Sequence, residues 1–285
     1  MGGRILEKKI AFLGPKATFC DLAATKIFPK EDRQPCMTIP ECIDAVHNGD
    51  ADYAVVPLEN ALEGSVNITL DYLIHEVSLP IVAEYSAPIR QHLMIHPTHA
   101  EHPVERVLSH SHAIAQCHKF LHGQLRGVPC ENITSTAAAA QYVHDHPDEY
   151  VGAIANELAS NEYNLQIIEW DIHDYAHNHT RFVVLGHKPL STEEIQLEKQ
   201  RDKTTVMILL PADHAGALHQ VLSAFSWRKL NLTKIESRPL KTGLGNYFFI
   251  IDIDKGMDDI LIPGAIAEME ALGCKVTVMG SYPSY

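Results

Sequence analysis

The sequence of 285 residues lacks the features that would place it in a membrane, in a secretory compartment or on a nucleic acid. Its six cysteines show no CxxC motif and no paired spacing, a pattern typical of reduced thiols. It has no run of about 18 apolar residues and no N-terminal signal peptide, so we expect a cytoplasmic protein without a membrane anchor. Acidic residues outnumber basic ones by 36 to 23, and the formal net charge of −13 argues against nucleic acid or an anionic membrane as a partner.

Cofactor and metal motifs are missing as well. No glycine-rich dinucleotide loop and no Walker A loop occurs, so no nucleotide cofactor is expected. Among the 18 histidines, the stretch HEVSL begins like a zinc-protease motif but ends in Leu79 instead of histidine. His92 and His96 are four residues apart, but the residues between them have the pattern of a strand and Pro97 follows at once. We therefore expect neither a metal nor any other cofactor.

What the sequence does contain is an alternation of short apolar strands and helical segments over its first two thirds. This alternation predicts an α/β fold in which helices cover a sheet, and ligands in such folds bind at the carboxyl ends of the strands. Strands are expected at 9–14, from 51 to a stop at Pro57, at 81–96 as one strand or two, at 104–110, 150–156 and 180–186, and helices at 18–28, 111–123, 134–146 and 157–164.

The composition of the chain changes after residue 186, where a polar and charged stretch has almost no apolar periodicity. The segments that follow have the order β-α-β-β-α-β, which is the ferredoxin-like arrangement. We therefore predict a first domain at 8–187, a linker at 188–203 and a second domain at 204–282. The expected strands of this second domain are 204–211, 231–240, 246–254 and 274–282, and its helices are 214–230 and 265–273.

Three polar motifs of the first domain stand where strands begin or end. VVPLENALEGSV at 55–66 closes one strand, SHSHAIAQC at 109–117 opens a helix whose free N–H groups could attract an anion, and NHTRF at 178–182 leads into an apolar strand. Taken singly, each motif is equally compatible with an acidic turn, a capped helix or an ordinary loop. The polar side chains that they contribute are Glu59, Asn60, Glu63, Ser109, His110, Gln116, Asn178, Thr180 and Arg181.

In their order and spacing, these motifs resemble the prephenate dehydratases that carry a C-terminal ACT regulatory domain. The likeness runs from FLGPKATF through STAAAA and ESRP to the closing GSYP, so it covers nearly the whole chain. Two positions depart from the family, which usually has Gly at Ala17 and Ser at Ala61. The resemblance implies two α/β lobes around a cleft, like periplasmic binding proteins, followed by an ACT domain. Because ACT domains usually pair, it also implies a homodimer or homotetramer.

The same resemblance implies a carbon–oxygen lyase that converts prephenate to phenylpyruvate, with loss of carbon dioxide and water, on the route to L-phenylalanine. Thr180 would donate to or orient the departing 4-hydroxyl, and the forked guanidinium of Arg181 would hold a carboxylate. The remaining catalytic assignments are Glu59, Asn60, Ser109, His110 and Gln116, and the substrate-binding ones are Phe182, Asn178 and Thr18.

The resemblance also implies that the second domain binds L-phenylalanine as a feedback inhibitor. Small residues at the start of a helix leave N–H groups free for the carboxylate of an amino acid. The residues assigned to this effector are Gly216, Ala217, Leu218, Asn231, Glu236, Ser237, Arg238 and Pro239. Two alternatives stay open at this point, namely arogenate as the substrate and a catalytically silent amino-acid sensor built on the same scaffold.

Overall fold

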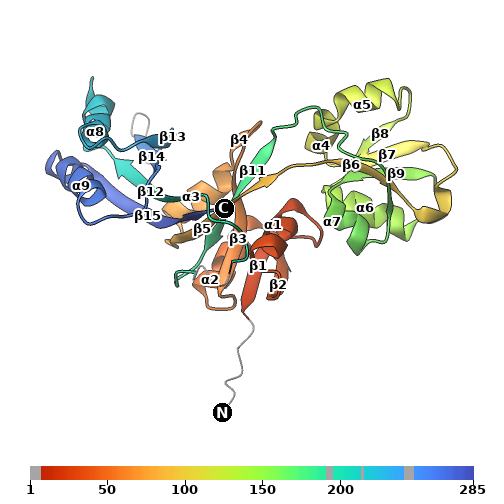
Figure 1. Ribbon diagram of the computed structural model, residues 1–285, viewed down its shortest axis with the longest axis horizontal. Helices are drawn as coiled ribbons and strands as arrows, with labels where there is room; N and C mark the ends of the chain where they lie inside the picture. Colours follow the sequence, from red (N-terminus) through yellow and green to blue (C-terminus); the bar gives the residue numbers. More distant parts are fainter. Residues whose placement is uncertain (1–7, 191–194, 213–214, 241–246) are drawn as a thin grey trace, which may run out of the picture. The chain divides into compact units, whose positions relative to one another are not determined.

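The structure is a computed structural model that describes residues 8–190, 195–212, 215–240 and 247–285 (Figure 1). Residues 191–194 of the predicted linker lie outside these ranges. The chain divides into two compact units: unit 1 consists of Met1–Ser78 and Tyr85–Val183, and unit 2 of Leu79–Glu84 and Val184–Tyr285. Among the described residues, no helix has the length and apolar character needed to cross a membrane.

The first part of unit 1 is built on a sheet with the strand order β11-β3-β1-β2. Strand β1 pairs in parallel with both β2 and β3, which puts the carboxyl ends of these three strands at one edge. Side chains cap two of the helices, because Thr18 accepts a hydrogen bond from the Asp21 N–H and Thr38 accepts one from the Glu41 N–H. The elements are β1 (Lys9–Leu13), α1 (Phe19–Ile27), β2 (Asp32–Cys36), α2 (Ile39–His47), β3 (Tyr53–Asn60), β4 (Gly64–Ser65), α3 (Asn67–His75) and β11 (His179–Leu185).

The sequence predicts that this strand stops at Pro57, but β3 continues to Asn60. Pro57 stands between the residues of β3 that pair with β1, which end at Val55, and those that pair with β4, which begin at Glu59, so neither of these two pairings uses its missing N–H. The Thr69 hydroxyl also donates to the Pro57 carbonyl at 2.7 Å. Asn60 is therefore held at the end of a strand instead of standing in a loop.

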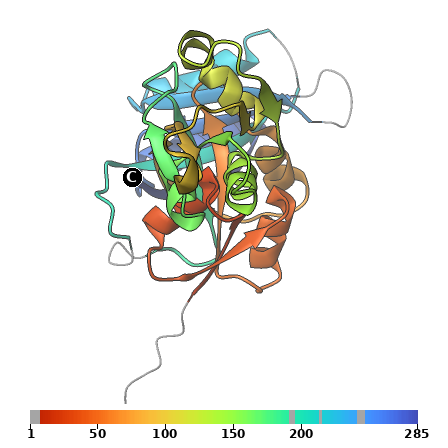
Figure 2. The same cartoon turned by 90° about the vertical axis from the view of Figure 1, so that its right-hand side faces the viewer.

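The second part of unit 1 is a five-stranded sheet with the order β10-β6-β9-β7-β8, seen in front in Figure 2. Alternate residues of a strand point to opposite faces. Met94, Leu108 and Ala153 pack under α6 and α7, whereas Leu93 and Ile154 pack under α4 and α5. The elements are β6 (His92–Ile95), β7 (Arg106–Ser109), α4 (Ser111–Gln116), α5 (His118–Gly123), β8 (Cys130–Asn132), α6 (Thr136–Asp145), β9 (Val151–Ala155), α7 (Glu157–Glu162) and β10 (Gln166–Glu169).

The helix predicted over 111–123 is in fact two helices that meet at Cys117, whose φ of −112° and ψ of 22° are not helical. The break has a local cause in Asp174. Its N–H donates to the Gln116 carbonyl, and its carboxylate accepts from the Lys119 N–H at 3.1 Å. These bonds take up backbone groups that would otherwise bond within one continuous helix.

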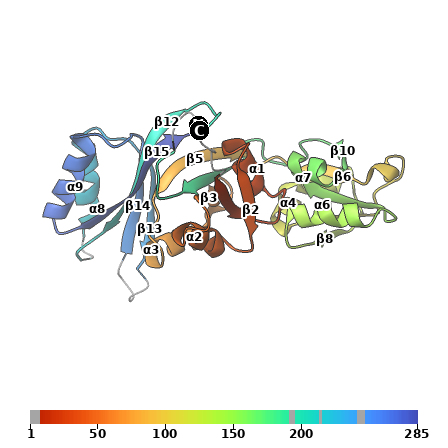
Figure 3. The same ribbon diagram turned by 90° about the horizontal axis from the view of Figure 1, so that it is seen from below.

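Unit 2 has the predicted order β12-α8-β13-β14-α9-β15, with an antiparallel sheet ordered β13-β14-β12-β15. Helices α8 and α9 cover one face of this sheet (Figure 3), where Val206, Phe225, Ile251 and Met269 form part of the core. Strand β12 begins three residues earlier than predicted, at Arg201. The elements are β12 (Arg201–Leu209), α8 (Ala217–Ser226), β13 (Leu232–Pro239), β14 (Tyr247–Ile253), α9 (Leu261–Ala271) and β15 (Lys275–Ser284).

A buried ion pair joins β12 to β5 (Ile81–Pro88) within unit 2. The Lys203 ammonium lies 2.6 Å from a carboxylate oxygen of Glu84, and the two side chains are only 6% and 2% exposed. The Ser284 hydroxyl of β15 donates to the same oxygen at 3.0 Å. The backbones also approach closely here, so that a Cβ added to Gly280 would clash with the Ile81 carbonyl oxygen.

We predict that Lys203→Met destabilises unit 2 by about 3–5 kcal/mol, because it leaves the buried Glu84 carboxylate without its cation. Lys199→Met is the matched control, since Lys199 pairs with Asp202 at 2.8 Å but both side chains are more than 40% exposed. Its effect should stay below about 1 kcal/mol. Urea unfolding followed by circular dichroism measures both, and equal losses in the two variants would contradict the prediction.

Candidate active site

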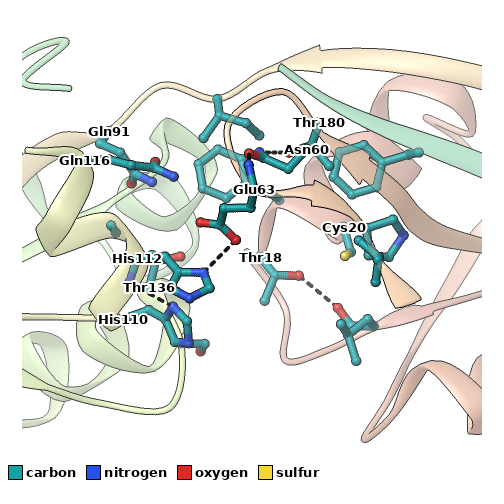
Figure 4. A pocket seen from close by; sticks show the side chains of 18 of the residues that line it. Thr18, Cys20, Asn60, Glu63, Gln91, His110, His112, Gln116, Thr136 and Thr180 are labelled. Carbon is teal, nitrogen blue, oxygen red and sulfur yellow. Dashed lines mark hydrogen bonds and ion pairs between the residues drawn. The ribbon is translucent and has the colours of Figure 1, made fainter. Parts of the chain in front are cut away.

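A cavity of about 460 Å³ in unit 1 collects most of the residues that the sequence motifs single out. It is lined from the start of α1, the end of β3, the start of α4, the start of α6 and the beginning of β11 (Figure 4). The predicted residues that line it are Thr18, Asn60, His110, Gln116, Thr180 and Phe182, and those that do not are Glu59, Ser109, Asn178 and Arg181.

Side-chain alternation along β11 decides which residues of the Thr-Arg-Phe triplet reach the cavity. Thr180 and Phe182 line it, whereas Arg181 between them does not, because successive side chains of a strand point to opposite faces. The Arg181 guanidinium lies 3.3 Å from the Glu59 carboxylate of β3, the neighbouring strand. The resemblance implies that Arg181 holds a substrate carboxylate, and in the structure a carboxylate of the chain itself lies beside its guanidinium.

Asn60 has a fixed orientation that sets the direction of its hydrogen bond to Thr180. Its Oδ1 accepts from the backbone N–H groups of Leu62 and Glu63, at 2.9 and 3.1 Å. Its Nδ2 therefore faces the other way and donates to Thr180 Oγ1 at 2.8 Å and to Asn178 Oδ1 at 3.2 Å. Because the Thr180 oxygen accepts this bond, its own O–H remains able to donate to a molecule in the cavity.

Ser109 and Thr18 use their hydroxyls on the protein backbone. Ser109 is fully buried and donates to the Ile154 carbonyl at 2.6 Å, which ties β7 to β9. Thr18 donates to the Leu13 carbonyl at 3.0 Å, and its oxygen caps α1. Just before it, Ala17 adopts a left-handed φ of 63°, the conformation for which the glycine usual in the family is suited.

Two histidines at the start of α4, His110 as its cap and His112 in its first turn, line the cavity. His110, and not Ser111, caps the helix, because its Nδ1 accepts from the His112 N–H at 3.4 Å. His112 Nδ1 lies 2.8 Å from a carboxylate oxygen of Glu63, which lies far away in the sequence (Figure 4). Burial lowers the pKa of His110, and a positive charge on His112 lowers it further, while the Glu63 carboxylate partly offsets both effects.

Two glutamines place buried carbonyl oxygens beside the cavity. Gln91 is 2% exposed, and in the described chain the Oε1 atoms of Gln91 and Gln116 have no hydrogen-bond partner. The two side chains lie next to each other in Figure 4. A buried polar atom without a partner costs about 1–3 kcal/mol, so a ligand that bonds to these carboxamides gains that free energy. Sequence reasoning missed Gln91, because it lies between two strands in no recognisable motif.

Charged side chains are scarce around the cavity. Among the described residues that line it there is neither lysine nor arginine, and its ionisable groups are Glu63, Cys20 and the two histidines of α4. Within the described ranges, no group of three or more His, Cys, Asp or Glu residues is placed to hold a metal ion.

The residues predicted to bind the effector lie at two ends of unit 2. Gly216, with a φ of 88°, caps the start of α8, whose first two residues are Ala217 and Leu218. Asn231 lies beyond the other end of α8, roughly 15 Å away by the rise of a ten-residue helix, and lines a separate hollow with Phe225 and Lys229. The remaining four, Glu236, Ser237, Arg238 and Pro239, form the end of β13, where Glu236 pairs with Arg238 at 3.1 Å.

Comparisons with known proteins identify the family of the chain. The family model "PDT: Prephenate dehydratase" matches residues 10–190. A prephenate dehydratase of Bacillus subtilis is 57% identical over 282 residues, covering 97% of this chain and 99% of that protein. These matches define an enzyme of aromatic amino acid biosynthesis. The chain belongs to the prephenate dehydratase family.

Solved structures add two relatives. The crystal structure of a prephenate dehydratase from Arthrobacter aurescens in complex with L-Phe is similar, with a TM-score of 0.82, 33% identity and coverage of 96% of this chain and 89% of that one. A structure named as a novel type of quorum quenching acylase has a TM-score of 0.84, 26% identity and 98% coverage of both chains. The fold is thus shared with a protein named for another reaction, so the fold alone does not determine the reaction.

We predict that His110 titrates below the usual histidine pKa of about 6.5, because the buried imidazole disfavours its charged form. Glu63→Gln should lower the pKa of His110 further, since it removes a negative charge that favours imidazolium. Glu131→Gln, which alters a carboxylate paired with Arg106 outside the cavity, is the control and should leave the pKa unchanged. NMR titration of the His110 ring measures its pKa in the parent protein and in both variants. A pKa above the usual histidine value in the parent protein would contradict the prediction.

Proposed function

We propose that this chain converts prephenate to phenylpyruvate in a cytoplasmic route to L-phenylalanine, acting as a carbon–oxygen lyase. The observation that carries the proposal, beside membership of the family, is the hydrogen bond from Asn60 to Thr180 in the cavity. It leaves a hydroxyl donor on a rigid strand, turned toward the space where a substrate fits.

The chemistry of the reaction matches a site of this kind. The ring carboxylate leaves as carbon dioxide and its bonding electrons enter the ring. The C4–O bond breaks at the same time, the ring becomes aromatic, and the departing hydroxide takes a proton to become water. No base has to remove a proton from carbon, so the useful groups are a donor on the departing oxygen and contacts that fix the geometry.

We assign the donor role to Thr180. Asn60 orients the Thr180 hydroxyl, and buried Asn178 accepts the second N–H of Asn60 and so keeps its amide in place. Phe182 packs beside Thr180 on the same side of β11. His110 and Gln116 line the cavity as polar contacts for the substrate.

The other predicted residues receive supporting roles in the proposal. Arg181 and Glu59 pair with each other, and we assign to them the joining of β11 and β3 next to the Asn60–Thr180 bond. Ser109 and Thr18 hold the strand end and the helix start from which the cavity is lined.

We predict that Thr180→Ala lowers kcat by about 10²–10³, the usual cost of losing one donor aimed at developing charge. Asn60→Asp should lower kcat to a similar degree although Thr180 remains, because the new carboxylate takes the hydrogen of the Thr180 hydroxyl. Thr180→Ser keeps the donor and serves as the control. Steady-state kinetics measure kcat of each variant, and circular dichroism shows whether the variant is folded. An Asn60→Asp variant with a kcat within about threefold of the parent would refute the assigned direction of the hydrogen bond between Asn60 and Thr180.

The experiment that tests the function itself is incubation with prephenate while phenylpyruvate is followed by its absorbance in alkali. Arogenate is assayed in parallel, with release of phenylalanine as the readout, because one relative is an arogenate dehydratase of Petunia hybrida that is 33% identical over 289 residues. Turnover of neither substrate would leave the silent amino-acid sensor as the better proposal.

We further propose that residues 8–187 form a catalytic domain of two lobes, like periplasmic binding proteins, that 188–203 form a linker, and that 204–282 form an ACT domain that binds L-phenylalanine. The β-α-β-β-α-β order of unit 2 and the L-Phe complex of the Arthrobacter relative support the second domain. Because Gly216 and Asn231 lie at opposite ends of α8, one chain does not bring both to a single amino acid. The proposal therefore includes a dimer or tetramer, in which one chain supplies the first residue and its neighbour the second.

We predict that L-phenylalanine inhibits the enzyme with a coupling of about 1–3 kcal/mol, which corresponds to a shift in substrate affinity of roughly 5–150-fold. Asn231→Ala should weaken binding of L-phenylalanine in titration calorimetry, whereas Ser223→Ala, at a half-buried position of α8 whose hydroxyl donates to the His219 carbonyl, should not. Light scattering gives the number of chains in each sample. The absence of binding heat, together with full activity in millimolar L-phenylalanine, would leave the second domain without a regulatory role.

A further inference from the structure

The cavity faces an electrostatic problem that its own residues have to solve, if prephenate is the substrate as proposed above. Prephenate carries two carboxylates, yet the described residues lining the cavity include neither lysine nor arginine. The side chains there that can become cationic are His110 and His112, on an otherwise acidic chain with a formal net charge of −13.

The two histidines are not equivalent. His110 is partly buried, and its ring stands 4.9 Å from that of His112, so the two imidazoles disfavour being charged together. His112 is the more exposed, and its Nδ1 lies 2.8 Å from a carboxylate oxygen of Glu63, with side chains 60% and 42% exposed. This is the distance of a charge-assisted hydrogen bond between an imidazole and a carboxylate.

Glu63 therefore holds its carboxylate beside the imidazole of His112 in a cavity that, under the proposed function, takes an anion. We infer that His112 binds a carboxylate of the substrate, and that Glu63 occupies the same place on His112 and has to be displaced when the substrate enters. Glu63 thus acts as an internal competitor, and His112 is a substrate-binding residue that sequence reasoning missed.

The backbone permits such an exchange. The Glu63 N–H donates to Asn60 Oδ1 at 3.1 Å, so the backbone of Glu63 is fixed by the same amide that orients Thr180. The exposed carboxylate of Glu63 can rotate away from His112 about its side-chain bonds while that backbone bond stays in place. Release of Glu63 thus leaves the orientation of the Thr180 hydroxyl unchanged.

The reaction indicates which carboxylate His112 holds. The ring carboxylate gives up its charge as it leaves, so a cation beside it would stabilise the bound substrate more than the transition state. The carboxylate of the pyruvyl side chain keeps its charge throughout and is still present in phenylpyruvate. We therefore assign His112 to the pyruvyl carboxylate, which means that product binding depends on the same contact.

The test compares three variants of the full chain with the parent enzyme. Glu63→Gln should lower both the KM for prephenate and the inhibition constant of phenylpyruvate about two- to fivefold, the range expected for loss of an exposed ion pair. His112→Gln should raise both constants about five- to tenfold, with kcat within about threefold of the parent. Glu131→Gln removes the same charge outside the cavity, where Glu131 pairs with Arg106, and should move neither constant.

The outcomes separate this inference from the function on which it rests. If the parent enzyme does not turn over prephenate, the proposed function fails. If it does, and Glu63→Gln leaves the KM and the inhibition constant unchanged or raises them, the competition is refuted. If His112→Gln lowers kcat but changes neither the KM for prephenate nor the inhibition constant of phenylpyruvate, the role of His112 in binding is refuted. In the His112→Gln background the effect of Glu63→Gln should shrink, and an undiminished effect would show that Glu63 acts without His112.

Discussion

The site depends on one side-chain amide, that of Asn60. Two backbone N–H groups hold its oxygen, so its nitrogen is turned toward Thr180 and Asn178, more than a hundred residues away in the sequence. A single carboxamide thereby joins the turn after β3 to the start of β11 and sets the direction in which the Thr180 hydroxyl donates. The proposed donor is a weak acid by itself, and its usefulness comes from this fixed direction.

The alternation of side chains along two neighbouring strands sorts the other polar residues. In β11, Thr180 faces the cavity and Arg181 does not, and in β3 Asn60 lines the cavity while Glu59 pairs with Arg181. The guanidinium of Arg181, the fixed cation of the motif, thus pairs with a carboxylate of the protein itself. In the proposed function, recognition of the anionic substrate therefore falls to histidines and carboxamides, which keeps the fixed charge near the reacting ring low.

Much of the architecture follows from patterns that one sequence displays. The alternation of apolar strands with helical segments predicts the α/β fold, and the β-α-β-β-α-β order of unit 2 is found where it is predicted. Short or weakly patterned elements escape this reasoning. Strand β2 has the sequence DRQPC, with neither an apolar run nor alternation, and its pairing with β1 decides that it is a strand. Helix α2 does carry local signals, the Thr38 cap and a proline in its first turn, but it is only nine residues long and sequence reasoning passed over it.

The sequence by itself determined the fold class, the order of the elements and the motifs that contribute Asn60, His110, Gln116 and Thr180 to the cavity, because periodicity and motif spacing are local properties. Only the tertiary structure decided that Arg181 pairs with Glu59, that Gln91 joins the cavity and that His112 meets Glu63. Each of these depends on contacts between segments 49 to 122 residues apart, or on which face of a strand a residue occupies. Such contacts are set by strand pairing and packing, which leave no local pattern in the chain.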